Sequence, residues 1–214
     1  MSLISPSRRV RRTPFSDGVE AGGVKAYTVY NHMLLPTVFR SLEEDCRHLK
    51  SAVQLWDVAC ERQVEIRGRD AARLMQMITP RNLAGMAPGQ CYYVPTVDDA
   101  GGMLNDPVAV MLEADRFWVS IADSDLLFWV KGLARGARLD VTVDEPDVSP
   151  LGIQGPKSDE LLGRVFGDRI RELRFFRWAR FDFGGKAMLI ARSGYSKQGG
   201  FEIYVEGTEN GRPL

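Results

Sequence analysis

The sequence contains few of the residues from which metal centres and disulfide frameworks are built. It has two histidines and three cysteines in 214 residues. Neither histidine, His32 or His48, has a partner at metal-ligand spacing. The cysteines are too few and too scattered for a disulfide framework or a zinc site; they are Cys46, Cys60 and Cys91. The sequence therefore predicts no metal site, and it indicates a reducing compartment.

Net charge and long apolar runs are also lacking. The 28 Lys and Arg side chains are balanced by 28 Asp and Glu side chains, which argues against a general electrostatic grip on nucleic acid or an anionic membrane. No apolar run approaches the ~20 residues that a membrane helix needs. The Arg-rich N-terminus lacks the apolar segment that a secretory signal requires. We expect a cytoplasmic protein, monomer or homodimer, with no nucleic-acid or membrane partner.

Several common catalytic motifs are absent as well. The sequence has no Walker phosphate loop, no Gly-x-Gly-x-x-Gly after a strand, no Gly-x-Ser-x-Gly elbow and no His-Glu-x-x-His pair. Function therefore has to be sought in less common arrangements of polar residues.

The apolar residues, 44% of the chain with Ala and Cys included, recur at both helical and strand spacing. Residues 1–24 are polar and contain Pro and Gly, so we expect an N-terminal arm with little regular structure. A helix begins near Ser41, because Ser41 and Glu44 have capping-box spacing. Strands and helices are mixed without a strict βαβα order, which predicts an α+β fold dominated by antiparallel strand pairs.

Residues 91–122 predict a meander of three strands, in which the second strand carries polar residues. Pro107 interrupts this strand and cannot donate to a ladder, so an edge position or a bulge is expected there. Asn105 and Asp106 precede the proline among apolar neighbours, and polar groups are costly there if they are buried without partners. Asp106 either faces a cationic or protonated ligand or caps the bulge.

Residues 66–74 and 153–161 share one pattern. In each, a strand ends in Ile-x-Gly, and a helix presents a leucine eight positions after the isoleucine. The pattern indicates two copies of a strand–helix unit, unless two common loops resemble each other by chance. We therefore expect residues 25–214 to form one region of two pseudo-repeated subdomains, split near residues 50 and 145.

A glycine-rich loop at 193–200 leads into a last predicted strand at 201–206. Strand alternation places Glu202 and Tyr204 on one face and the apolar residues between them on the other. The polar face lies next to the loop that carries Tyr195, Lys197 and Gln198. It is either part of a ligand site or a solvated surface.

Aromatic and polar residues mix with apolar ones in two further places. One is the segment 30–36, which includes Tyr30 and Met33, and the other is the pair Tyr92-Tyr93. Such a mixture suits a ligand pocket, and it suits an ordinary core equally well.

Two segments resemble a known family. Residues 101–108, Gly-Gly-Met-Leu-Asn-Asp-Pro-Val, resemble the Gly-Gly-x-x-Asp-Asp segment of the glycine-cleavage T protein (aminomethyltransferase) superfamily. Residues 194–203 are similar to its Gly-Tyr-Thr-Gly-Glu-x-Gly-Phe-Glu segment. The resemblance is closer to one branch, the dimethylsulfoniopropionate-dependent demethylases. It extends over almost the whole chain, through residues 7–14, 27–36, 56–59, 61–64, 121–125, 153–157 and 191–194.

The resemblance implies both a fold and an activity. The fold would be a folate-binding ring of three domains, of which this chain would cover the first two and lack the C-terminal barrel. The activity would be redox-neutral, in-line transfer of one methyl group from the sulfonium of dimethylsulfoniopropionate to N5 of tetrahydrofolate. Its products would be methylmercaptopropionate and 5-methyltetrahydrofolate.

The resemblance also implies residue roles. The catalytic residues would be Asp106 and Tyr204. Substrate would be bound by Tyr30, Met33, Tyr195, Lys197 and Glu202. Tetrahydrofolate would be bound by Tyr93, Asn105, Asp106, Gln198 and Glu202.

Two positions depart from the aminomethyltransferase pattern. Gln198 stands where those enzymes have a glutamate directed toward the pterin, and Lys197 replaces a glycine. Both changes favour a different methyl donor. The alternatives are an aminomethyltransferase or related one-carbon transferase on an amine donor, and a non-catalytic folate-binding module.

Overall fold

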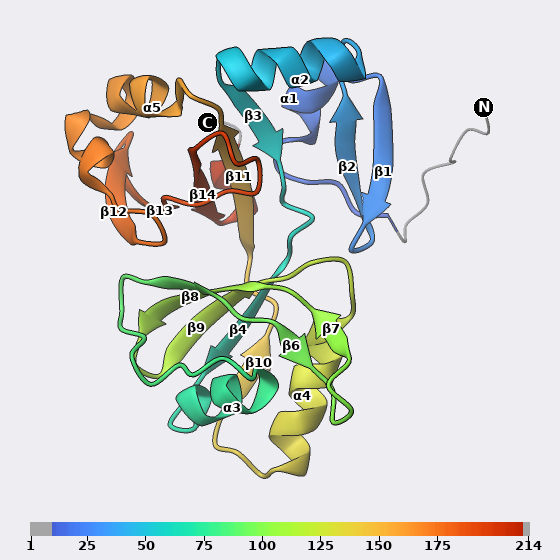
Figure 1. Ribbon diagram of the computed structural model, residues 1–214, viewed down its shortest axis with the longest axis vertical. Helices are drawn as coiled ribbons and strands as arrows, with labels where there is room; N and C mark the ends of the chain where they lie inside the picture. The colour runs from blue at the N-terminus through green and yellow to red at the C-terminus, as the bar shows by residue number, and fades with distance from the viewer. Residues whose placement is uncertain (1–9, 212–214) are drawn as a thin grey trace.

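Two antiparallel sheets of five strands each form the frame of the protein (Figure 1). The computed structural model describes residues 10–211. The upper sheet in Figure 1 has the strand order β12-β13-β14-β11-β3. Its strands are β3 (Gln54–Asp57), β11 (Val148–Gln154), β12 (Trp178–Phe183), β13 (Lys186–Ala191) and β14 (Gly200–Glu206).

The lower sheet is built from a single continuous stretch of chain and has the strand order β10-β4-β9-β8-β5. Its strands are β4 (Gln63–Arg67), β5 (Cys91–Tyr93), β8 (Val108–Glu113), β9 (Arg116–Ser120) and β10 (Thr142–Asp144). Two helices, α3 (Ala71–Ile78) and α4 (Leu126–Gly136), lie below it. A separate two-stranded ribbon is formed by β6 (Thr96–Val97) and β7 (Met103–Asn105).

The remaining elements accompany the upper sheet (Figure 1). The helix α5 (Ser158–Phe166) and the 3-10 turn η1 (Asp168–Glu172) follow β11. The hairpin of β1 (Ala26–Tyr30) and β2 (Met33–Val38) lies beside β3, together with the helices α1 (Ser16–Ala21) and α2 (Leu42–Ser51). A second 3-10 turn, η2 (Thr208–Asn210), follows β14.

Three buried clusters lie in successive layers. The first, around Leu74, packs α3 and α4 against one face of the lower sheet. The second, around Leu162, packs α5 against one face of the upper sheet. The third joins the inner faces of both sheets, through Cys91, Val110, Leu112, Trp118, Val148, Leu189, Ala191 and Tyr204. Because side chains alternate along a strand, one strand can serve two clusters: on β9, Phe117 belongs to the first cluster and Trp118 to the third.

The chain crosses between the sheets twice, at residues 58–62 and 145–147. The two crossings are tied to each other, because the Arg62 guanidinium donates to both carboxylate oxygens of Glu145, at 2.9 Å from Nε. Arg11 donates to the same carboxylate at 3.0 Å. The subdomain division near residues 50 and 145 stays a prediction.

Several predicted elements are confirmed. The Ser41 hydroxyl accepts from the Glu44 amide at 3.2 Å and caps α2. The meander is formed by β5, β8 and β9, which are neighbours in the lower sheet. Gly68 and Gly155, the glycines of the repeated pattern, each follow a strand and precede a helix, with φ of +130° and +125°.

Two expectations of local structure are wrong, and one element was not predicted. The arm contains α1 at residues 16–21, held because Thr13 donates to the buried Asp57 carboxylate at 2.5 Å. The β1–β2 hairpin was not expected; its turn at Asn31 and His32 has positive φ without a glycine. Pro107 produces neither an edge nor a bulge. Because it has no N–H to donate, the strand divides there into β7 and β8, and β8 is internal in its sheet.

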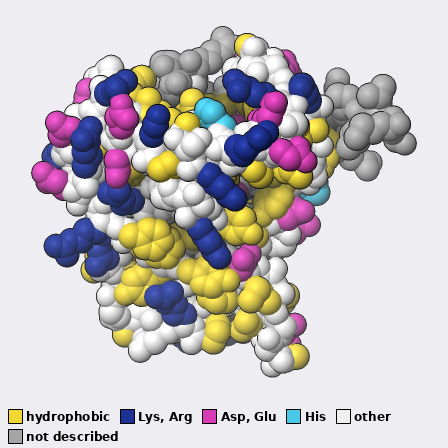
Figure 2. Space-filling model, turned by 45° about the horizontal axis from the view of Figure 1, so that its top comes forward, with side chains coloured by type: hydrophobic (Ala, Val, Ile, Leu, Met, Phe, Trp, Pro, Cys, Tyr) yellow, Lys and Arg dark blue, Asp and Glu magenta, His cyan; other side chains and the backbone are white. Residues whose placement is uncertain are grey.

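Charged side chains of both signs are interleaved on the face drawn in Figure 2, and hydrophobic side chains gather in its lower part. No helix within residues 10–211 combines the length and the apolar composition that crossing a bilayer requires.

The glycine that ends β11 gives a test of the fold. A Cβ at Gly155 would lie 2.4 Å from the Ala52 carbonyl oxygen, at a φ that L-residues rarely adopt. We expect Gly155→Ala to lower the free energy of unfolding by about 2–4 kcal/mol, measured in urea. The control is Gly132→Ala in α4, where a Cβ meets nothing within 4 Å, and stability should rise by up to about 1 kcal/mol. Equal stability of the two variants would contradict this account.

Candidate functional site

A carboxylate on the inner face of the upper sheet is the centre of the candidate site. Glu202 is half-buried on β14, and its Oε2 accepts hydrogen bonds from Ser193 Oγ at 2.8 Å and Tyr204 Oη at 3.2 Å. Burial raises the pKa of Glu202, and these two hydrogen bonds oppose the rise. Both donors bind the same oxygen, so Oε1 has no hydrogen-bond partner in the described part of the chain and can accept from a ligand.

Tyr204 lies between the sheets with 0% of its side chain exposed. Its ring is 6.0 Å from that of Trp118, between centroids, and Trp118 comes from the lower sheet. Burial, and then the charge of Glu202, raise the pKa of Tyr204 well above its usual value, so its hydroxyl is a donor. The polar face of β14 is therefore not a solvated surface, and Tyr204 and Glu202 share it as predicted.

A second carboxyl, Glu61, lies at the first crossing between the sheets and is half-buried. Burial, followed by the charges of Glu202 and Asp106, raises the pKa of Glu61 to about 8. Within residues 10–211, no side chain forms an ion pair or hydrogen bond with its carboxyl group. Glu61 also influences Tyr30: burial and then the Glu61 charge raise the pKa of Tyr30 to about 12.

Asp106 is exposed in the short link between β7 and β8. The preceding Asn105 is 5% exposed, and its amide is used in structure: Nδ2 donates to the Ala122 carbonyl at 3.0 Å and to Ser124 Oγ at 2.7 Å, while Oδ1 accepts from the Ala122 amide. Asn105 thus fixes the backbone from which Asp106 projects, and it is satisfied without a ligand.

The loop at 122–124, which Asn105 contacts, is also held by the β1–β2 turn. Asn31 Nδ2 donates to the carbonyls of Cys60 at 2.9 Å and Ala122 at 3.1 Å, and its Oδ1 accepts from the Ser124 amide at 3.0 Å. These bonds place Tyr30, the preceding residue, next to the crossing that carries Glu61.

The glycine-rich loop is anchored by Gln154 at the end of β11. Gln154 Nε2 donates to the Ser193 carbonyl at 3.2 Å, and its Oε1 accepts from Ser196 Oγ at 2.6 Å. A Cβ at Gly194 or Gly200 would collide with this amide, at 2.2 and 2.6 Å. The glycines therefore allow the loop to close on Gln154, which sets Ser193 beside Glu202.

The other predicted site residues are three residues of the glycine-rich loop, Tyr93 on β5 and Met33 on β2. Tyr195 is 90% exposed, Lys197 is exposed, and Gln198 is half-buried, all in the loop. Tyr93 is 37% exposed on β5. Met33 is buried at 7% and lines a cavity of about 130 Å³ with Arg62 and Glu145. No hydrogen bond, ion pair or ring contact joins Tyr93 or Met33 to Glu202, and the roles of all five residues stay predictions.

Sequence reasoning missed Glu61 and Ser193 as site residues. Both lie within stretches that carry the family resemblance, 61–64 and 191–194, and that was the available signal. Neither has a local pattern that sets it apart, because the site assembles from strands and crossings far apart in the chain.

All three cysteines are free; burial, and then neighbouring carboxylates, raise the pKa of the Cys60 thiol to about 12 and that of Cys91 further. No group of three or more His, Cys, Asp and Glu in the described chain has a metal-binding arrangement. The prediction of no metal stays a prediction.

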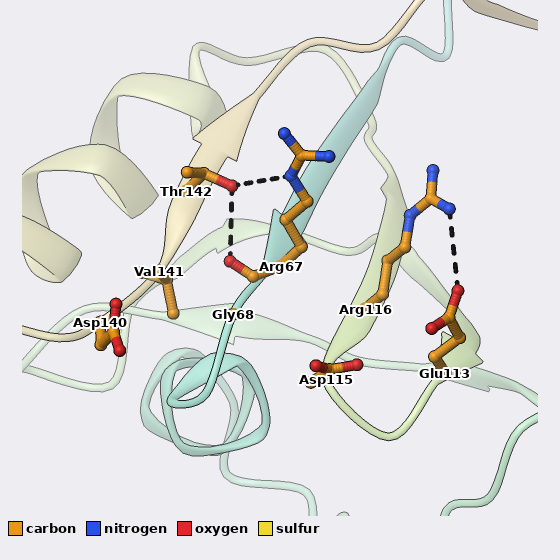
Figure 3. Close-up of a pocket in the computed structure, with 8 residues that line it drawn as sticks. All are labelled: Arg67, Gly68, Glu113, Asp115, Arg116, Asp140, Val141 and Thr142. Atoms are coloured by element: carbon orange, nitrogen blue, oxygen red, sulfur yellow. Dashed lines mark hydrogen bonds and ion pairs between the residues drawn. The ribbon is translucent and has the colours of Figure 1, made fainter.

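A separate, open depression of about 560 Å³ lies at the opposite end of β4 from Glu61 (Figure 3). Its two arginines are already engaged. Arg67 Nε donates to Thr142 Oγ1 at 3.0 Å, and Arg116 pairs with Glu65 at 2.8 Å. The depression is lined by charges of both signs and is not part of the carboxylate cluster.

The comparison with family models identifies the class of protein to which this fold belongs. A family model described as the GCVT N-terminal domain matches residues 15–212. The chain belongs to this family.

Curated relatives differ widely in their similarity to the chain. The dimethylsulfoniopropionate demethylase DmdA of Ruegeria pomeroyi is 65% identical over 214 residues, which are 100% of this chain and 59% of that protein. The aminomethyltransferase of Bacillus subtilis is 27% identical over 201 residues, 91% of this chain and 54% of that protein. The chain thus spans more than half, but less than two thirds, of the length of these relatives.

Two solved structures share the fold. The glycine cleavage system aminomethyltransferase T from Bartonella henselae has a TM-score of 0.80 at 21% identity, covering 92% of this chain and 54% of that one. The heterotetrameric sarcosine oxidase from Corynebacterium sp. U-96 has a TM-score of 0.57 at 17% identity, covering 91% of this chain and 86% of that one. The predicted α+β, aminomethyltransferase-like fold is confirmed.

The raised pKa of Glu61 predicts how stability depends on pH. The ionisable groups that interact electrostatically with Glu61 are Glu202, Asp106, Tyr30, Tyr204 and Cys60. A carboxyl whose pKa is about 8 when folded, against 4.5 as its ordinary value, binds more protons in the folded state. Its contribution to stability is therefore lost as pH rises between those values. We expect Glu61→Gln to be more stable than the parent protein at pH 8.5, by about 1–2 kcal/mol, with a smaller difference at pH 5.

Urea unfolding at the two pH values measures this difference. The matched control is Glu172→Gln, because Glu172 is exposed in η1, and it should leave the pH dependence unchanged. A Glu61→Gln protein that is less stable than the parent at pH 8.5 would show that the carboxylate has a stabilising partner.

Proposed function

We propose that this chain carries the donor and folate sites of a tetrahydrofolate-dependent dimethylsulfoniopropionate demethylase. The observation that carries the proposal is the 65% identity with the Ruegeria pomeroyi demethylase over all 214 residues. The aminomethyltransferase of Bacillus subtilis is identical at only 27%. The proposal includes small-molecule partners and a cytoplasmic location, as expected from the sequence.

The proposed reaction moves one methyl group with no net oxidation or reduction. The bond between the methyl carbon and sulfur breaks, and its electron pair stays on sulfur to give the neutral thioether methylmercaptopropionate. A bond from the same carbon to N5 of tetrahydrofolate forms, and the N5 proton is released. Because the sulfonium is already activated, alignment is the main task of the protein, and proximity of this kind contributes about 7–11 kcal/mol.

Glu202 fits a role as acceptor for the N–H groups of a pterin. Its Oε1 is unpartnered, whereas Oε2 is held by Ser193 and Tyr204, so the carboxylate has a fixed orientation and one free oxygen. Tetrahydrofolate, when bound, supplies the methyl acceptor. Tyr204 then serves the reaction by holding Glu202, with its hydroxyl as donor.

Asp106 is the proposed catalytic carboxylate. It is exposed at the site and has no ion-pair partner in the described chain, and its charge balances positive charge as this passes from sulfur to nitrogen. Asn105 positions Asp106 through its bonds to Ala122 and Ser124. Tyr93 and Gln198 complete the proposed folate contacts.

The remaining substrate roles fall to residues at the rim. Tyr30 lies beside Glu61 and offers an aromatic face for the sulfonium. Met33 is the register partner of Tyr30 across the β1–β2 turn. Lys197 carries the charge that would pair with the propionate carboxylate, and Tyr195 is exposed beside it.

Product analysis tests the proposed function. The protein, in the longest form that its gene encodes, is incubated anaerobically with dimethylsulfoniopropionate and tetrahydrofolate. We expect methylmercaptopropionate and 5-methyltetrahydrofolate in equal amounts. Folate binding without either product would contradict the proposal, and amine donors would then be assayed for the aminomethyltransferase alternative.

Substitution of Asp106 gives a sharper prediction. We expect Asp106→Asn to lower turnover by at least about 10²-fold, because charge stabilisation is lost, while the urea midpoint stays within error of the parent, since Asp106 is exposed. Asp99→Asn, an exposed aspartate in the β6–β7 turn, is the matched control and should leave turnover unchanged. Parallel loss of folding and turnover in Asp106→Asn would make the residue structural.

A further inference from the structure

Two buried asparagines from different elements hold the same short loop, residues 122–124. Asn31, in the β1–β2 turn, is 3% exposed, and Asn105, at the end of β7, is 5% exposed. Both side chains donate through Nδ2 to the Ala122 carbonyl, at 3.1 Å from Asn31 and 3.0 Å from Asn105. Asn31 accepts from the Ser124 amide at 3.0 Å, and Asn105 donates to the Ser124 hydroxyl at 2.7 Å. We call Asn31, residues 122–124 and Asn105 the asparagine clamp.

Asn31 also reaches the first crossing between the sheets. Its Nδ2 donates to the Cys60 carbonyl at 2.9 Å, and Glu61 is the next residue along the chain. One residue of the turn is therefore bonded both to the backbone beside Glu61 and to the loop that holds Asn105. Because Asp106 directly follows Asn105, the asparagine clamp links the backbone positions of the two carboxyl groups.

The turn conformation favours a side chain of this kind at residue 31. Asn31 has a φ of +48°, in the left-handed region that asparagine tolerates better than most side chains. Its backbone N–H donates to Asp123 Oδ1 at 2.8 Å, which fixes the turn on the loop. Glycine would adopt this φ at less cost, but it would leave the Cys60 carbonyl and the Ser124 amide without their bonds to Asn31. The amide is thus the contribution of asparagine here, and both of its ends are used within the protein.

Asp106 needs such support because its own side chain provides none. It is exposed in the two-residue link between β7 and β8 and has no ion-pair partner among residues 10–211. Its charge raises the pKa of Glu61, so the two carboxyl groups lie near enough to interact and would gain by moving apart. The position of Asp106 therefore depends on the backbone that Asn105 and the loop at 122–124 hold.

We propose that Asn31 is a positioning residue for methyl transfer, which fixes Asp106 relative to Glu61. It acts through its bonds to the Cys60 carbonyl and to the loop at 122–124, and not on the substrates themselves. A charge stabilises a transition state best when it is held in place before the reaction begins. The inference rests on the proposed function, because that function makes Asp106 the catalytic carboxylate.

A double-mutant cycle on the longest form of the protein that the gene encodes tests this role. Asn31→Gly removes the amide and keeps a residue that tolerates the positive φ. We expect it to lower kcat for dimethylsulfoniopropionate by at least about tenfold, because the reacting groups are misplaced, while KM for both substrates changes by less than about threefold. In an Asp106→Asn background, Asn31→Gly should lower kcat by less than about threefold, because both changes act through one group. Full multiplication of the two losses would overturn the proposal.

Two further variants control for the turn and for folding. His32→Gly is the matched control, because His32 is exposed and shares the left-handed turn, with a φ of +62°, and kcat should stay unchanged. Asn31→Asp keeps the shape and an acceptor for the Ser124 amide, but it loses both donors, so kcat should again fall by about tenfold or more. It replaces Asn31→Gly if that protein does not unfold cooperatively in urea. Parental kcat in the Asn31 variants, or loss of cooperative folding in both, would overturn the proposal.

Amide hydrogen exchange, followed by NMR, separates this inference from the proposed function. The Ala122 amide donates to Asn105 Oδ1 at 3.0 Å and not to Asn31, so its exchange reports whether the loss of Asn31 reaches Asn105. We expect Asn31→Gly to speed this exchange by at least about tenfold beyond any change in the β13 amides, which report global unfolding. Faster exchange in a protein without methyl transfer would support the asparagine clamp and contradict the proposed activity. Unchanged exchange in a protein with parental turnover would support the activity and overturn the clamp.

Discussion

The burial of one carboxylate between two sheets governs much of this structure. Glu202 needs donors where water has little access, and it obtains them from Ser193 and Tyr204. Tyr204 in turn requires the apolar surroundings of the third cluster, where it meets Trp118. Ser193 requires a loop closed on Gln154, which only glycine permits at residues 194 and 200. Sheet packing and loop conformation thus both follow from satisfying Glu202.

The site also retains electrostatic repulsion that an ordinary core would eliminate. The charges of Glu202 and Asp106 both raise the pKa of Glu61, and none of the three carboxyl groups has an ion-pair partner in the described chain. A protein with equal numbers of acidic and basic residues could have paired them, as it pairs Arg62 with Glu145 only one residue away. The unfavourable charge is confined to the space between the sheets, where a positively charged ligand would relieve it.

Local rules predicted local features well. The Ser41 cap, the meander, the interruption at Pro107 and the shared face of Glu202 and Tyr204 follow from the spacing of a few residues. The β1–β2 hairpin did not, because its Asn31-His32 turn takes its support from the loop at 122–124. The pairing of β11 with β3 and with β14 could not be predicted either, since these strands lie about 50 to 95 residues apart and no local pattern encodes their register.

The two crossings at 58–62 and 145–147 have a consequence for synthesis on the ribosome. The lower sheet and its helices lie entirely within residues 63–144, so this unit is complete before any strand that pairs with β3 has been made. β3 then waits as an unpaired edge until β11 emerges, and the upper sheet closes only when β14 follows. Vectorial synthesis therefore builds the lower unit first, and the space between the sheets is the last part of the molecule to form.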